Sequence, residues 1–429
     1  MALVYPFQGF RYSKEAVGDL NKVVTQPYDK TTPAMQDEYY ERSPYNVVRI
    51  TLSREQDPSY PEAGTTFRKW IRKKVLVRDS SPSIYAYYQE YRIENETRTQ
   101  RGFISLLDLK NAEAGVIPHE HTLAAPKQDR LNLMRSLEAN EDFIYMLYSD
   151  ETLAINTVID KAISGREPDI EVIDEYGAIH RVWAISQPDV IDAVRNGMQQ
   201  QRLFIADGHH RFETSVNFMN ECERKGWRPG GIESFDKRMI TCFNSADGVT
   251  ILPTHRLVRD LPGFEPRFFL RSIEQYFEVE PASSPESLWE RMKEERQSHV
   301  FGFYAANLQG YFFLRLREEA TSDPLILSHT EPYRKLDVSI LHTLLLERFL
   351  GIDADKLAAQ SHIDYVRERE TAIRLVDESK CQAAFFLNPT TAEQMQLVAS
   401  LGERMPQKST DFFPKLLTGL VFMQMRIRK

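Results

Sequence analysis

The stretch "LFIADGHHRFETSVNF", residues 203–218, constrains the fold more than any other part of the sequence. Four apolar or small residues, typical of a buried strand, run directly into Asp207-Gly208, and a helical pattern begins at once. An Asp-Gly pair permits a tight turn, because glycine adopts backbone conformations that other residues avoid. The sequence therefore predicts a strand, a turn and a helix, with His209, His210 and Arg211 in the helix's first turn.

Basic residues are unusual at this end of a helix. The first N–H groups have no partner within the helix and carry partial positive charge, so each cation there costs about 0.3–1 kcal/mol. A phosphate held by the backbone N–H groups and the Arg211 guanidinium would resolve the conflict. The alternative is that the histidines are neutral and that Arg211 pairs with Glu213 or another acid. The Asp-Gly turn after a buried strand favours the anion site.

A second candidate is "VIPHEHTLAAPKQDR", residues 116–130. In an extended segment the His119 and His121 imidazoles face one way and Glu120 the other. Such a His-x-His pair could supply two metal ligands, and Glu120 could act as a general base. The alternative is a polar loop leading into a helix that starts near Pro126.

Cations recur at the start of that second helix. Lys127 and Arg130 flank Asp129 in its first turn, where cations are again unfavourable. We interpret Lys127 and Arg130 as further phosphate ligands and Asp129, with Asp207, as a candidate Mg²⁺ ligand.

Two later loops carry basic residues. His255 and Arg256 follow an expected strand, and "PQKSTDFFPK", residues 406–415, contains Lys408 and Lys415. Taken alone, each pattern is more typical of a solvated loop than of a site. Together with the other two motifs, His255 and Lys408 are predicted to be additional phosphate clamps.

The 429 residues, 42% hydrophobic, suffice for two or three cores. β-Branched and aromatic residues predict strands at 45–53, 83–93 and 101–109, and the segments 238–244 and 249–257 predict a hairpin that turns at Asp247-Gly248. Helical patterns lie between them, so the expected fold class is α+β, with mixed sheets and flanking helices. We divide the chain into an N-terminal region 1–110, a core domain 111–262 with both histidine motifs, and a C-terminal α+β domain 263–429.

The net charge of -8 argues against a nucleic-acid or membrane-surface partner, because either needs basic excess. No segment approaches the roughly 18 consecutive apolar residues of a membrane span, and no signal sequence is recognised. The three cysteines are widely spaced, which fits a reducing cytoplasm rather than a disulfide framework. We expect a cytoplasmic protein whose partner is a small phosphate-bearing molecule, and the sequence leaves a homo-oligomer open.

Familiar nucleotide and hydrolase motifs are missing from the sequence. It contains no Walker loop, no G-x-G-x-x-G, no G-x-S-x-G and no H-E-x-x-H. Any nucleotide would have to bind in another way.

Several segments together resemble a known family, the bacterial and archaeal proteins with domain of unknown function 1015. The segments are "YPFQGFRY", "QPYDK", "PHEHT", "ADGHHRFET", "LPTHRLV", "KLDVSILH" and "PQKSTDFFPKLLTGL". The "DGHHR" turn is also similar to the phosphate-binding turn of the ParB/sulfiredoxin-like superfamily, which includes nucleotide-dependent free serine kinases. This resemblance implies a nucleotide-binding core and a phosphate held by residues 207–211. One departure is Phe212, where many members have tyrosine.

The leading interpretation is a phosphotransferase that acts between ATP, ADP or pyrophosphate and a small hydroxy amino acid such as serine, in either direction, with Mg²⁺. Its catalytic candidates are Glu120, as the base, with His209 and His210. One alternative is a metal-dependent hydrolase with zinc on His119, His121 and one of the later histidines. Another is a regulatory protein that binds a nucleotide without catalysis.

Overall fold

The computed structural model describes residues 3–112, 115–120, 124–308 and 310–429. The chain forms two compact units. Unit 1 comprises residues 1–118, 122–249 and 414–429, and unit 2 comprises residues 119–121 and 250–413. The chain therefore leaves unit 1 for residues 119–121, leaves it again for residues 250–413, and ends in unit 1.

Unit 1 is built on one large mixed sheet in the order β6-β11-β8-β13-β5-β4-β10-β9, with β1 paired to β5. Its strands are β1 (Val4–Tyr5), β4 (Ile84–Ile93), β5 (Glu96–Asp108), β6 (Val116–Ile117), β8 (Ile144–Tyr148), β9 (Ile170–Ile173), β10 (Ile179–Ile185), β11 (Leu203–Asp207) and β13 (Lys237–Asn244). The β6–β11 and β8–β13 pairs are parallel, and the other pairs are antiparallel. The interior strand β8 is buried at every residue and lies between β11 and β13.

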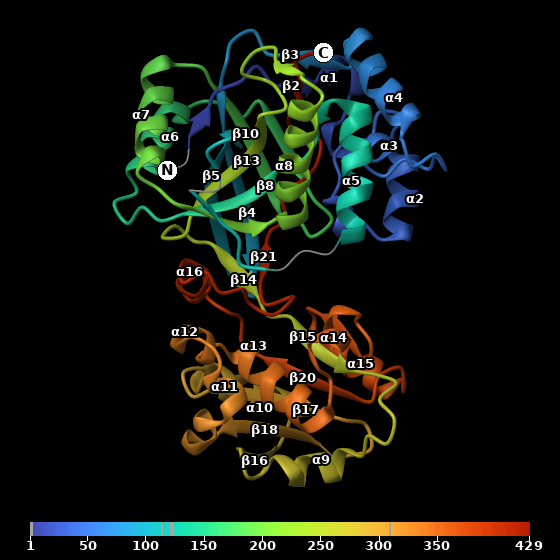
Figure 1. Cartoon of the computed structure of the whole chain (residues 1–429), viewed down its shortest axis with the longest axis vertical. Coiled ribbons are helices and arrows are strands. Elements are labelled where there is room, and N and C mark those ends of the chain that lie inside the picture. Colours follow the sequence, from blue (N-terminus) through green and yellow to red (C-terminus); the bar gives the residue numbers. More distant parts are fainter. Residues whose placement is uncertain (1–2, 113–114, 121–123, 309) are drawn as a thin grey trace. The chain divides into compact units, whose positions relative to one another are not determined.

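Helices lie on both sides of this sheet (Figure 1). The longer ones are α2 (Pro33–Arg42), α4 (Pro61–Arg72), α5 (Ala124–Leu137), α6 (Ala154–Ile163), α7 (Pro188–Gln199) and α8 (His209–Arg224), and α1 (Lys14–Val17) and α3 (Val48–Thr51) are single turns. The apolar faces of α6 and α7 pack on the sheet as one hydrophobic core. Helices α5 and α8 pack against each other, so the cationic starts of both predicted helices belong to neighbouring elements.

Short paired strands complete unit 1: β2 (Phe10–Tyr12) with β3 (Leu76–Arg78), β7 (Ala139–Asn140) with β22 (Met423–Gln424), and β12 (Arg228–Pro229) with β23 (Ile427–Arg428). The chain's last segment is thereby fixed to unit 1 by two strand pairs. Two 3₁₀ turns, Leu20–Lys22 and Tyr28–Lys30, lie before α2.

Unit 2 has an antiparallel sheet in the order β16-β18-β17-β20-β15-β19. Its strands are β15 (His255–Val258), β16 (Phe277–Ala282), β17 (Val300–Tyr304), β18 (Tyr311–Leu316), β19 (Ile363–Val366) and β20 (Ala383–Leu387), and a separate pair is formed by β14 (Thr250–Leu252) and β21 (Asp411–Phe413). The helices are α9 (Pro266–Ile273), α10 (Pro285–Glu294), α11 (Pro324–Leu327), α12 (Glu331–Arg334), α13 (Asp337–Ile340), a π-helix Leu341–Phe349, α14 (Ala354–Ala358), α15 (Arg369–Asp377) and α16 (Ala392–Ser400), with a 3₁₀ turn at Glu318–Ser322. Helices α10 and α15 share a hydrophobic core with the sheet.

The predicted α+β class with mixed sheets and flanking helices is confirmed. Two local predictions are wrong. Residues 45–53 are not a strand but contain the helical turn α3, which begins where the Asn46 side chain accepts a hydrogen bond from the Val48 N–H at 2.9 Å. The hairpin at Asp247-Gly248 does not form either, because β13 pairs with β5 and β8, whereas β14 pairs with β21.

Candidate functional site

The predicted strand-turn-helix at residues 203–218 is present as β11, Asp207-Gly208 and α8. Gly208 is the N-cap of α8 and has a φ of 95°, in the left-handed region that favours glycine. The Asp207 side chain holds the turn, since its Oδ1 accepts a hydrogen bond from the Gly208 N–H at 2.8 Å. No side chain caps the helix, and no acidic residue lies in its first turn.

Arg211 folds back under this turn rather than extending into solvent. Only 6% of the residue is exposed, and its Nη1 donates to the Phe143 carbonyl at 2.6 Å. Its guanidinium nitrogens lie 3.7 Å from Asp142 and 3.6 Å from Asp207. A Cβ on Gly208 would come within 3.0 Å of Arg211 Nε. Glycine at the turn therefore leaves the space that the guanidinium fills.

Two lysines from distant parts of the chain act on the same turn. Lys415 Nζ lies 3.5 Å from Asp207 Oδ2, and the lysine is 7% exposed. Burial alone would raise the pKa of Asp207, but Lys415, Arg211 and Lys30 together hold that pKa well below its usual range. The Asp207 carboxylate is therefore ionised at neutral pH, with three cations around it.

Behind the turn lies a narrow cavity in unit 1 with room for about one water molecule. It is lined by Arg130, Met134, Glu141, Asp142, Arg211, Thr214 and Arg238. We call its five charged residues the buried charge cluster: Arg130, Glu141, Asp142, Arg211 and Arg238, each less than 9% exposed. Asp142 accepts from Arg238, whose Nε has no hydrogen-bond partner within the described residues.

The ionisation of Glu141 in this cluster is strongly perturbed. Burial raises its pKa, the neighbouring Asp142 carboxylate raises it further, and Arg238 and Arg130 lower it, with the result that the pKa is about 7. Two adjacent buried carboxyl groups cannot both ionise cheaply, even with arginines nearby. Glu141 is therefore poised to exchange a proton near neutral pH.

The residues predicted at the start of α5 are mostly engaged within unit 1. Arg130 is held by Asp129, whose Oδ2 accepts from Arg130 Nη2 at 2.6 Å, and it stacks on Tyr28 with 4.4 Å between guanidinium and ring centre. Lys127 Nζ donates to Glu213 at 2.7 Å. The second carboxylate oxygen of Asp129 accepts from the Tyr60 hydroxyl. Asp129 thus acts as an ion-pair partner here.

Other predicted residues belong to unit 2. Glu120 is partly buried, with its Oε1 3.8 Å from His119 Nε2, and His121 lies outside the described residues. Lys408 is exposed. His255 is fully buried against Phe386, and burial, followed by Arg369 and Arg256, lowers its pKa to about 3. A neutral imidazole offers no positive charge to a phosphate, so we leave His255 out of the site proposed below.

Among the described residues, no group of three or more His, Cys, Asp or Glu side chains is placed to hold a metal ion, and His121 of the zinc alternative lies outside them. His209 is 8% exposed at the start of α8, and His210 is partly exposed beside it.

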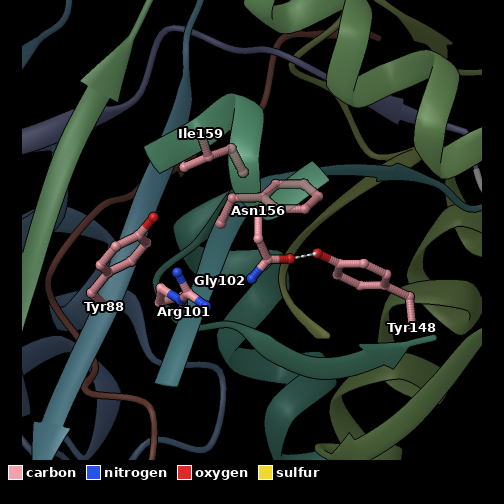
Figure 2. A pocket seen from close by; sticks show the side chains of 7 residues that line it. Tyr88, Arg101, Gly102, Tyr148, Asn156 and Ile159 are labelled. Atoms are coloured by element: carbon pink, nitrogen blue, oxygen red, sulfur yellow. Dashed lines mark hydrogen bonds between the residues drawn. The ribbon is translucent and has the colours of Figure 1, made fainter. Parts of the chain in front are cut away.

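A second small pocket of unit 1 is lined by polar side chains that include Arg101, Tyr148 and Asn156 (Figure 2). The Tyr148 hydroxyl donates to Asn156 at 2.8 Å, and Asn156 donates to Asp247 at 2.8 Å. Arg101 binds Asp247 through two nitrogens and Asp160 through a third. This network links α6 to β5 and to the turn after β13, and we assign it a structural role.

Sequence reasoning missed the three residues Glu141, Asp142 and Arg238 entirely, placed Lys415 in a solvated loop, and gave "QPYDK" no role in the site. Tyr28–Lys30 belong to the "QPYDK" segment, and its place among the family motifs was a signal that could have pointed to them. The other residues have no local pattern that marks them, because they become neighbours only through the pairing of β8 with β13 and through the return of residues 414–429 to unit 1.

A family model described as "Protein of unknown function (DUF1015)" matches residues 4–339. The chain belongs to this family. The resemblance seen in the sequence motifs is thereby confirmed, and the family's description assigns no activity. No curated protein matches the chain.

Solved structures show a distant likeness to this member of the family. A conserved hypothetical protein from Pyrococcus furiosus has 11% identity and a TM-score of 0.33, over 73% of this chain and 92% of the other. A free serine kinase in complex with AMP has 12% identity and a TM-score of 0.35, over 72% and 86%. SbnI from Staphylococcus aureus has 8% identity and a TM-score of 0.36, over 73% and 85%.

Across the described residues, every helix is too short or too polar to cross a bilayer.

Proposed function

We propose that the turn at Asp207–Arg211 binds a phosphate group of a nucleotide or of another small phosphate-bearing molecule. One observation carries the proposal: a 16-residue helix begins at a left-handed glycine with no side-chain cap and no first-turn acid, while Lys415, Arg211 and Lys30 gather at Asp207. A helix start of this kind supplies backbone N–H donors and partial positive charge, and the lysines add full charges.

The buried contacts divide the work among the residues. Arg211 is committed to the Phe143 carbonyl, so it shapes the turn and contributes charge from beneath. Lys415 and Lys30 come from other segments and supply the charge that neutralises a phosphate. Asp207 keeps the turn closed through Gly208.

We further propose that the protein is a phosphotransferase between ATP, ADP or pyrophosphate and a small hydroxy amino acid such as serine, in either direction. Phosphoryl transfer depends mainly on positioning and on neutralising charge, which is what a cationic turn on a rigid strand supplies. The acceptor class comes from the resemblance of the "DGHHR" turn. Mg²⁺ would join the phosphates, as it does in other phosphoryl transfers.

A thermal-shift series tests the phosphate site. ATP, ADP, pyrophosphate and phosphoserine are each added to the full chain, and at least one should raise the unfolding midpoint, because a ligand present at 100 times its Kd stabilises the native state by about 2.7 kcal/mol. Lys415→Met keeps most of the buried stem and removes the charge, so it should reduce that shift. Lys69→Met, on the exposed side of α4, is the matched control and should respond like the natural protein.

Two results would contradict the phosphate site: no phosphate compound shifts the midpoint, or Lys415→Met responds like Lys69→Met. Transfer is measured separately, as phosphoserine formed from serine and the bound donor, or consumed in the reverse reaction. Binding without transfer would favour the regulatory alternative over the phosphotransferase.

A further inference from the structure

Three motifs of the sequence that the phosphate site leaves unused come together inside unit 2. The His119 carbonyl accepts from the Met405 N–H at 2.8 Å, and His119 Nε2 lies 3.0 Å from Thr410 Oγ1. Arg256 Nη2 donates to the Lys408 carbonyl at 3.0 Å. His119 of "PHEH", Arg256 of "PTHR" and the "PQKST" segment thus lie together in one cluster.

Arg256 is a buried cation without an acidic partner. It is 1% exposed, and no carboxylate of the described residues lies within 4.0 Å of its guanidinium nitrogens. Its hydrogen bonds go to neutral acceptors: His342 Nε2 at 3.1 Å and the carbonyls of Thr254, Gln407 and Lys408. Burial lowers its pKa to about 10, so the cation is under-compensated where it stands.

Tyr365 supplies a second group that lacks a partner. It lies directly opposite Arg256 in the β15–β19 pair, on the sheet's edge strand, with the guanidinium 5.3 Å from its ring centre. Its hydroxyl is buried and makes no hydrogen bond in the described parts of the chain. Buried hydroxyl groups are nearly always bonded, so this one indicates an absent acceptor.

An acidic group limits what that acceptor can be. The partly buried Glu120 acts electrostatically on both Arg256 and Tyr365. A single arginine with a carboxylate in its vicinity suits a singly charged anion better than a doubly charged phosphate. A ligand that carries both a carboxylate and a cation would satisfy all three groups.

We propose that unit 2 binds a small zwitterion of the α-amino acid class, whose carboxylate is held by Arg256 and the Tyr365 hydroxyl and whose ammonium group faces Glu120. The inference goes beyond the phosphate site, and none of its contacts needs a phosphate. It gives Glu120 a binding role in addition to the base predicted from the sequence.

Binding is tested by isothermal titration of the full chain with each of the twenty L-amino acids, without phosphate compounds. At least one should bind. The best binder is then compared with its amine, which lacks the carboxylate, and with its acid, which lacks the ammonium group. The amine should lose binding entirely, whereas the acid should bind more weakly.

Two variants assign the contacts. Tyr365→Phe should leave the unfolding midpoint of the free protein unchanged, because its hydroxyl has no partner there, and should raise the Kd by roughly 10- to 100-fold, as expected for a hydrogen bond to a charged group. Tyr311→Phe, on β18, is the matched control with an unchanged Kd. Glu120→Gln should weaken the binding of the amino acid but not the binding of the corresponding acid that lacks the ammonium group.

The proposal is overturned if no amino acid binds, or if Tyr365→Phe and Tyr311→Phe have the same Kd. Either result would make Arg256 a structural fastener of the 406–410 loop only. Because no phosphate is present in these titrations, failure here leaves the thermal-shift result for Lys415→Met unaffected, and the two sites stand or fall separately.

Discussion

Replacing Glu141 by Gln tests whether the buried charge cluster holds a proton near neutral pH. The side chain is 7% exposed and lines the cavity with Asp142 and three arginines. Burial, and then Asp142, raise its pKa from an ordinary 4.5 to about 7. Gln has the shape of the protonated acid but cannot ionise, so the variant keeps the packing and removes the titration.

The sign follows from proton linkage. Between pH 4.5 and 7 the folded state binds the Glu141 proton and the unfolded state does not, so the free energy of unfolding of the natural protein falls as pH rises through this window. Raising the pKa from 4.5 to about 7, at about 1.4 kcal/mol for each tenfold change in proton affinity, amounts to roughly 3.5 kcal/mol. The Gln variant escapes this loss, and its advantage should grow from pH 4.5 to pH 7 and then level off.

Urea unfolding between pH 4.5 and 8 measures the effect as the difference in midpoint between variant and natural protein. Glu151→Gln removes the same charge from an exposed position and serves as the control. A Gln variant whose difference from the natural protein stays flat with pH, as in the control, would refute the buried-proton argument. A difference in midpoint that shrinks between pH 4.5 and pH 8 would also contradict the argument, because it would mean that the folded state binds the Glu141 proton less tightly than the unfolded state.

Two further substitutions test the turn at Gly208 in unit 1 and the buried His255 in unit 2. Gly208→Ala should lower the free energy of unfolding by more than Gly226→Ala does. Both glycines have positive φ, but only the new Cβ at residue 208 meets Arg211, at 3.0 Å. Urea midpoints should show a loss of about 1 kcal/mol from backbone strain in both variants and a further loss in Gly208→Ala. His255→Leu should make the protein less sensitive to acid. Because the pKa of His255 is about 3 in the folded state, the unfolded state binds the proton first as pH falls below 6.5, and this costs the natural protein roughly 3 kcal/mol of unfolding free energy by pH 4. Equal losses of thermal midpoint in variant and natural protein between pH 7 and pH 4 would disprove the prediction.

The strand-turn-helix at residues 203–218 was predictable because its signals are local. An apolar run, an Asp-Gly pair and a helical spacing of apolar residues all lie within one stretch, and they agree with one another. The structure places Asp207 at the strand end, Gly208 at positive φ and the helix immediately after it. The cationic helix start was visible for the same reason.

The segment 45–53 misled because two patterns overlap in it. Val48 and Ile50 alternate with polar residues as in a strand, but Val47 and Thr51 are buried as well, which is the spacing of a helical turn. The Asn46 side chain, which accepts from Val48 N–H, decides between them. Short apolar runs are ambiguous by periodicity alone, and the asparagine just before the run was the better signal.

The buried charge cluster could not be predicted, because its pairs are long-range. Asp142 and Arg238 are 96 residues apart, and their contact depends on β8 and β13 lying parallel in the sheet. Lys415 reaches Asp207 only because the chain returns to unit 1 after residue 413. Sequence patterns report local conflicts of charge, whereas the partners that resolve them are chosen by topology.

Buried charge has a different meaning in the two units. In unit 1 the buried cations have carboxylate partners within the chain: Arg130 pairs with Asp129, Arg238 with Asp142, and both Arg211 and Lys415 with Asp207. In unit 2, Arg256 has only neutral hydrogen-bond partners. Ion pairs within the chain need no ligand to explain them, so the proposed phosphate site rests on the uncapped start of α8 and on the presence of Lys30 as a third cation at Asp207. An unbalanced buried cation opposite an unbonded hydroxyl does call for one, which is why the amino acid is assigned to Arg256 and the phosphate to Asp207–Arg211.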